Sequence, residues 1–184
     1  LYLQVVLGYG PLEAGLMFIP MEVTFATVGP LSGALSDRYG SRGLTTTGLG
    51  ILAASLFLFS GISATASYSE IATFLALVGV GLGLFAAPNM SSIMRSSPAE
   101  RRGVASAVRS TIFNSGAVIS ISLVAAILVT ELPYATASAM LSGQLATIGA
   151  VEQLGFVSGI RKALLVSAVL SLIGMIPSAI KGAK

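Results

Sequence analysis

Five long apolar segments constrain the fold of this chain more than any other feature of its sequence. A helix that crosses the apolar core of a bilayer needs about 20 predominantly apolar residues. Five segments meet this requirement, at residues 12–36, 44–63, 71–94, 104–130 and 163–180. We therefore expect an all-α membrane protein in which residues 12–184 form a polytopic transmembrane helix bundle. Residues 1–11 would hold the end of a truncated helix and an outside loop.

The composition supports a bilayer as the solvent. Hydrophobic residues make up 54% of the chain and charged residues only 9%, whereas a soluble domain carries about 25% charged residues. The 21 glycines fit the same interpretation, because small residues let membrane helices approach closely. The formal net charge of +3 is too small to indicate nucleic-acid binding.

Three absent residue types exclude several functions. The chain has no cysteine, no histidine and no tryptophan. It therefore cannot build a disulfide, a thiol nucleophile, a His-ligated metal site or a Ser-His-Asp triad. We predict that the chain is not an enzyme and has no catalytic residues, no metal site and no bound cofactor.

The placement of basic residues predicts the orientation of the bundle. Along an alternating five-span path, Arg161 and Lys162 fall on one side. A larger set falls on the other side: Arg38, Arg42, Arg95, Arg101, Arg102, Lys181 and Lys184. Since Lys and Arg concentrate in cytoplasmic loops, we expect the chain to start outside and to end in the cytoplasm. The long outside joint, residues 131–162, is expected to hold a short interfacial helix around 137–148.

Local signals predict how individual helices begin, bend and pack. Ser97 and Glu100 flank Pro98 in a pattern typical of a helix start. Prolines in or near the spans predict bends, at Pro20, Pro30, Pro88 and Pro177. The run Gly79-Val80-Gly81-Leu82-Gly83 lacks the strand and lysine of a nucleotide loop. Close helix packing through Gly79/Gly83, and through Gly29/Gly33, explains these glycines better.

One joint carries a specific motif, Gly33-Ala34-Leu35-Ser36-Asp37-Arg38-Tyr39-Gly40-Ser41-Arg42. Gly33 permits close helix approach, and Gly40 can take the left-handed conformation that ends a helix. Asp37 can pair with Arg38 or Arg42, or cap a neighbouring helix. A charged turn that obeys the positive-inside rule would also explain these residues. The pattern, however, resembles the inter-helix signature of the major facilitator superfamily, in its C-terminal-half copy.

Other segments resemble one branch of that superfamily. Residues 2–16, residues 98–107 and the joint that ends in 156–163 are similar to parts of the fourteen-helix drug/proton antiporters of the EmrB/QacA type. The resemblance implies that the chain is the C-terminal fragment of such a protein. Its spans would be the last five of fourteen helices, and the N-terminal helix bundle would be a partner, together with the lipid bilayer.

This resemblance implies a secondary active transporter in a bacterial cytoplasmic (inner) membrane. It would export amphipathic drugs or other small molecules by alternating access, driven by the proton gradient, and further subunits of an efflux system are among the implied partners. The alternatives are a major facilitator carrier that takes up or exports another small solute, and a non-transporting membrane scaffold or channel subunit.

Glu22 is the sharpest candidate for a proton or substrate site. It lies near the middle of the first span, about 15 Å along the helix from Leu12. A carboxyl group inside a membrane is costly and usually faces a cavity or a partner, and proton coupling needs such a group. The alternative is a structural glutamate that packs against another helix.

Three further residues inside the spans are candidates for the same site. Arg109 and Asn114 lie on the fourth span, about 140° apart around the helix, so they do not share a face. Arg109 is close enough to the span boundary to extend toward the cytoplasmic interface instead. Asn114 and Asn89 also suit interhelical hydrogen bonds.

Overall fold

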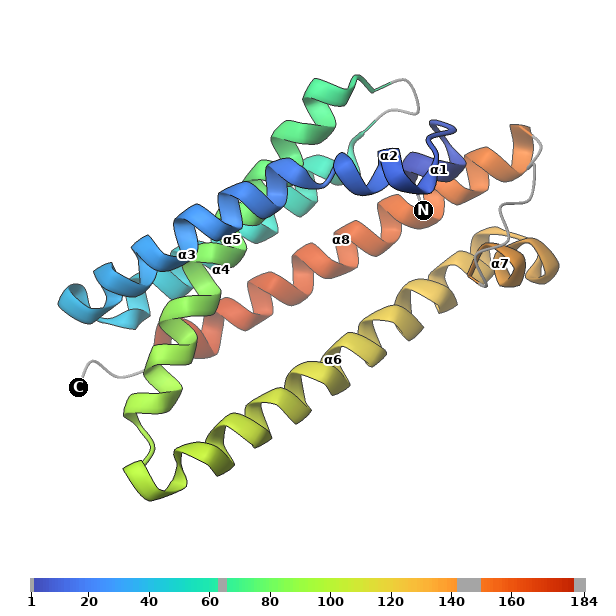
Figure 1. Cartoon of the computed structure of the whole chain (residues 1–184). Helices are drawn as coiled ribbons and strands as arrows, with labels where there is room; N and C mark the ends of the chain where they lie inside the picture. The colour runs from blue at the N-terminus through green and yellow to red at the C-terminus, as the bar shows by residue number, and fades with distance from the viewer. Residues whose placement is uncertain (1, 63–65, 142–149, 181–184) are drawn as a thin grey trace.

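The computed structural model describes residues 2–62, 66–141 and 150–180 (Figure 1), and every secondary-structure element in these ranges is helical. This confirms the predicted all-α fold. The elements, in chain order, are α1 (Tyr2–Val5), α2 (Pro11–Leu16), α3 (Ile19–Tyr39), α4 (Ser41–Ser60), α5 (Tyr68–Arg95), a 3-10 turn (Ala99–Arg101), α6 (Arg102–Glu131), α7 (Tyr134–Leu141) and α8 (Ala150–Ile180).

Five helical segments of the described chain are long and apolar enough to cross a membrane. They are Pro11–Tyr39, Ser41–Ser60, Tyr68–Arg95, Ala99–Glu131 and Glu152–Ile180, one for each predicted span. The last segment differs most, because α8 begins at Ala150 and not at residue 163. Polar residues such as Glu152 and Lys162 interrupt the apolar run, but Phe156 and Val157 between them are buried, and their packing extends the helix.

The first span is divided in two. Met17 and Phe18 form a turn between α2 and α3. Pro20, in the first turn of α3, causes this break, because a proline lacks an N–H and its ring clashes with the carbonyl four residues earlier. The helices continue through Pro30, Pro88 and Pro177, so only Pro20 interrupts a span in the described chain.

Two joints are shorter or differently built than predicted. Gly40 alone separates α3 from α4, with φ +85° and ψ 158°, a combination that is essentially restricted to glycine. The predicted helix cap at Ser97 is wrong, although a helical segment does begin two residues later, with the 3-10 turn Ala99–Arg101. The Ser97 hydroxyl donates back to the carbonyl of Ile93 in α5, Pro98 is extended, and α6 begins only at Arg102.

The predicted outside joint, residues 131–162, is only partly described. Its helix α7 spans Tyr134–Leu141, earlier than the predicted 137–148, and residues 142–148 lie outside the described residues. The same is true of Lys181 and Lys184, two of the basic residues that predict a cytoplasmic C-terminus.

Glycines on α5 bring it against α3. A Cβ added at Gly79 would lie 2.3 Å from the Met21 carbonyl oxygen, and one at Gly83 would lie 3.1 Å from the Gly29 nitrogen. Two hydroxyl groups of α3 also reach α5 carbonyls: Thr24 Oγ1 lies 3.0 Å from the Ala76 oxygen, and Ser32 Oγ donates to the Gly83 oxygen at 2.7 Å. The predicted packing role of Gly79 and Gly83 is confirmed.

The opposite face of α5 meets α4 in the same way. A Cβ at Gly81 would lie 2.8 Å from the Leu52 nitrogen, and one at Gly48 would lie 2.8 Å from the Phe85 nitrogen. Two residues along an α-helix are about 200° apart, so Gly81 faces away from Gly79 and Gly83. The helix α5 is therefore held between α3 and α4 at backbone-to-backbone distance.

The helices α6 and α8 lie outside the α3–α4–α5 group. The helix α8 packs along α4, where its Ser178 hydroxyl donates to Thr45 Oγ1 at 2.8 Å. Figure 1 shows α6 running apart from the α3–α4–α5 group, and every residue from 110 to 123 on it is exposed. The end of the bundle that carries α1, here called the α1 end, holds both buried apolar clusters, which include Ile71 and Phe156. The other end, here called the Gly40 end, holds the α3–α4 and α5–α6 joints.

We predict that Gly79→Ala destabilises the bundle. The added methyl group would collide with Thr24 and with the α3 backbone, and such overpacking costs about 1–3 kcal/mol. Gly43→Ala is the matched control, because its Cβ would meet nothing within 4 Å and alanine favours a helix. Thermal unfolding in detergent, followed by circular dichroism, should show a lower midpoint for Gly79→Ala only. Equal midpoints would contradict the packing described above.

Candidate functional site

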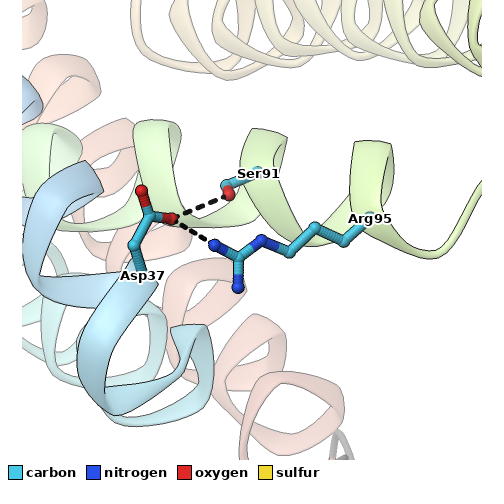
Figure 2. Close-up of polar contacts among 3 residues, drawn as sticks. All are labelled: Asp37, Ser91 and Arg95. Atoms are coloured by element: carbon cyan, nitrogen blue, oxygen red, sulfur yellow. Dashed lines mark hydrogen bonds and ion pairs between the residues drawn. The ribbon is translucent and has the colours of Figure 1, made fainter.

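Asp37 lies at the Gly40 end, where α3 and α5 come together. Figure 2 shows its carboxylate facing Arg95 and Ser91 on α5. Arg95 Nη2 lies 2.6 Å from Asp37 Oδ1, and the Ser91 hydroxyl lies 3.5 Å from the same oxygen. The expectation that Asp37 pairs with Arg38 or Arg42 is wrong. Both arginines are exposed, and neither makes an ion pair within the part of the chain that the structure describes.

The two glycines of the motif position this carboxylate. A Cβ on Gly33 would contact the Ala87 side chain at 3.7 Å, so α3 lies against α5 one turn before Asp37. Gly40 has the expected positive φ and reverses the chain directly after Tyr39. Asp37 is thereby held in the last turn of α3, beside the last turn of α5.

A second feature is a cleft of about 570 Å³ between α5 and α6. Its walls are mostly apolar, with aromatic rings on both sides. The lining residues are Leu82, Phe85, Ala86, Asn89 and Ile93 on α5, and Ala105, Val108, Arg109, Ile112 and Phe113 on α6. The volume falls within the range of about 300–1,000 Å³ that is typical of small-molecule sites. Two predicted site residues, Asn89 and Arg109, therefore line one cleft.

Arg109 is the charged residue of the cleft. Its guanidinium carbon lies 6.0 Å from the centroid of the Phe113 ring, at the outer limit of a cation–π contact. Phe113 is one turn further into the span, so this contact favours a position in the cleft over extension toward the interface. Asn114, as its spacing predicts, does not line the cleft, and its side chain is exposed.

Glu22 is not part of this cleft. It lies in the first turn of α3, directly after the break at Met17 and Phe18, where the positive end of the helix dipole favours a carboxylate. Its side chain is exposed and makes no ion pair with the described residues. The sequence predicts its depth in the span but does not predict that a helix begins beside it.

Several partners are not predictable from the sequence pattern. Ser91 and Arg95 both contact Asp37, and they lie one helical turn apart at the end of α5. At the α1 end, Lys162 of α8 forms an ion pair with Glu131 of α6. The neighbouring Arg161 donates to the Ile62 carbonyl oxygen at 2.9 Å. In the sequence, the one feature that points to these two contacts is the basic pair Arg161-Lys162 in an otherwise apolar region.

Helices of membrane length and a boundary motif on α3 together define a polytopic membrane protein of the transporter type. The chain belongs to the Major Facilitator Superfamily, whose sequence profile matches residues 1–121. This confirms the family suggested by the motif.

Curated relatives include several named transporters. "Uncharacterized transporter YebQ" of Escherichia coli (strain K12) is 38% identical over 110 residues, 60% of this chain and 24% of that protein. "Multidrug resistance protein Stp" of Mycobacterium tuberculosis (strain ATCC 25618 / H37Rv) is 34% identical over 127 residues, 69% of this chain and 24% of Stp. "Riboflavin transporter RibZ" of Clostridioides difficile (strain 630) is 27% identical over 113 residues, 61% of this chain and 25% of RibZ. The chain thus spans about a quarter of the length of these relatives. The family and the five apolar helices of the described chain indicate an integral membrane protein.

We predict that Asp37→Asn changes the stability of the fold very little. The Asp37 and Arg95 side chains are 56% and 60% exposed, and an exposed ion pair contributes about 0–1 kcal/mol. Thermal unfolding in detergent, measured at low and at high salt, should give midpoints close to those of the unchanged chain. A large loss of stability at both salt concentrations would show that Asp37 holds the fold together.

Proposed function

We propose that this chain is part of a secondary active transporter that exports small amphipathic molecules by alternating access, driven by the proton gradient. On this proposal it forms the last five helices of a fourteen-helix antiporter in a bacterial cytoplasmic membrane, with its C-terminus in the cytoplasm. The observation that carries the proposal is the Asp37–Arg95 pair, which joins two membrane helices at the segment that resembles the family's inter-helix signature.

The exposed ion pair suits a contact that forms in one state and breaks in another. The pair adds little to the stability of the fold, so the fold would tolerate its loss. When it is formed, it connects the last turns of α3 and α5. Apolar contacts close the α1 end, whereas the α5–α6 cleft occupies the half of the bundle toward the Gly40 end. This asymmetry fits a carrier better than a scaffold or a channel subunit.

The exposed part of α6 supports a partner bundle. Residues 110–123 include polar and small residues on all sides of the helix: Ser110, Thr111, Asn114, Ser115, Gly116, Ser120 and Ser122. Such residues are enriched where membrane helices pack against each other, and a helix that faced only lipid would not need them. We place the N-terminal helix bundle of the same transporter against this surface, and Asn114 within that interface.

Glu22 is the proposed proton-binding group. A carboxylate that faced lipid alone would be costly, so its exposed side chain is expected to face the partner bundle. In many transporters, a membrane helix is interrupted at the transport site, and the N-terminus of the second half-helix points at the site. The break at Met17 and Phe18 places the N-terminus of α3 beside Glu22 in the same way.

We predict that Asp37→Asn slows transport while it spares the fold. If the pair biases one conformation, its loss changes that equilibrium by up to about fivefold, because an exposed ion pair contributes at most about 1 kcal/mol. Export of a fluorescent amphipathic compound from cells that express the complete transporter measures this effect. The double variant Asp37→Arg with Arg95→Asp restores the opposite charges and should recover much of the rate. Full activity of Asp37→Asn would contradict the switching role.

We predict that Glu22→Gln abolishes proton-coupled export, because an amide cannot carry a proton. Everted membrane vesicles that contain the complete transporter should no longer release protons when substrate is added, as followed with a pH-sensitive dye. Glu100→Gln is the control, since Glu100 is an exposed residue of the α5–α6 joint. Unchanged coupling in Glu22→Gln would exclude Glu22 as the proton site.

A further inference from the structure

The lining of the α5–α6 cleft is positively charged. Arg109 is cationic, and none of the other lining residues, all within the described part of the chain, is acidic or basic. Asn89 adds an amide on the facing helix, and the remaining walls are apolar. The cleft thus has a positive group beside a largely apolar surface.

Arg109 lacks a counter-ion in the described chain. Of the ion pairs formed by described residues, neither includes it, and the contact with the Phe113 ring satisfies a guanidinium only in part. An arginine inside a membrane span is costly when it is unpaired. A bound anion would remove most of this cost, because a guanidinium forms its strongest hydrogen bonds with carboxylate, sulfonate or phosphate oxygens.

We propose that this cleft binds amphipathic organic anions and selects against organic cations. The anionic head binds Arg109, and the apolar or aromatic body packs against Phe85, Ile112 and Phe113. This inference rests on the proposed function, because it assigns the substrate class of the same carrier. An anionic lipid headgroup with its acyl chains has the same chemistry as a free amphipathic anion, and the experiment distinguishes the two.

The test uses three probes that share a pyrene body: pyrenebutyrate, the neutral pyrenebutanol, and a pyrenebutyl-trimethylammonium cation. Their affinities for the complete transporter are measured by fluorescence anisotropy in nanodiscs of phosphatidylcholine. We expect the anion to bind more tightly than the cation. Arg109→Gln should weaken anion binding about tenfold, the loss of a charge-assisted hydrogen bond, and should leave pyrenebutanol binding unchanged.

Two variants serve as controls. Arg109→Lys keeps the positive charge and should retain most of the anion affinity. Arg102→Gln removes an exposed charge from the start of the same helix and should have no effect. Unchanged pyrenebutanol binding shows that Arg109→Gln is folded. Equal or tighter binding of the cation, or an anion affinity that does not respond to Arg109→Gln, overturns the proposal.

The two sources of anion are separated by adding phosphatidylglycerol to the nanodiscs. Displacement of pyrenebutyrate in the unchanged protein, but not in Arg109→Gln, assigns the cleft to a lipid headgroup. Pyrenebutyrate binding that persists in the presence of phosphatidylglycerol assigns the cleft to a free amphipathic anion. Both results support an anion site. Export of a neutral compound is measured in parallel. Export without anion selectivity overturns only this inference, whereas anion binding without any export overturns only the proposed transport.

Discussion

The backbone contact between α3 and α5 fixes where the functional side chains lie. Lipid supplies no hydrophobic force between helices, so association depends on close packing and hydrogen bonds. The contacting residues of the two helices differ in number by nearly constant amounts: 52 for Thr24 and Ala76, 51 for Ser32 and Gly83, and 54 for Asp37 and Ser91. The helices therefore run parallel in one register from the glycine contacts to the ion pair. A side chain at Gly79 or Gly83 would separate them, and Asp37 would lose its position beside Arg95.

The helix α6, unlike α3 and α5, does not pack closely against its neighbours along its whole length. It meets α8 closely at the α1 end, where a Cβ on Gly159 would lie 2.9 Å from the Leu128 side chain and Lys162 pairs with Glu131. Toward the Gly40 end it diverges, and the cleft against α5 occupies this region. The short 96–101 segment joins this end of α6 to α5, and the space between the two helices is the cleft. This arrangement is the structural basis for assigning the cleft, rather than the closely packed α3–α5 contact, to a ligand.

Much of the fold follows from the sequence, because apolar length predicts that each of the five membrane spans exists. The packing role of Gly79 and Gly83 was also predictable, since small residues four positions apart share a helix face. The start of α8 was not, because its polar residues are balanced by the buried Phe156, which only tertiary contacts reveal. The partner of Asp37 was missed for a similar reason. Neighbours in sequence, Arg38 and Arg42, were the obvious candidates, whereas the partner lies 58 residues away and depends on the register of two helices.

Glu22 and Arg109, the two candidate charges within the spans, cannot neutralise each other in this arrangement. Glu22 is about 25 Å along α3 from the Gly40 end, whereas Arg109 is about 10 Å along α6 from the same end, at 1.5 Å per residue. The positive charge of Arg109 suits an anion, which a guanidinium binds through several N–H groups. On the proposed function, Glu22 is the group that carries the proton. On the proposed function, separate depths therefore assign separate tasks: substrate charge is recognised near the Gly40 end, and the proton is carried near the middle of the membrane.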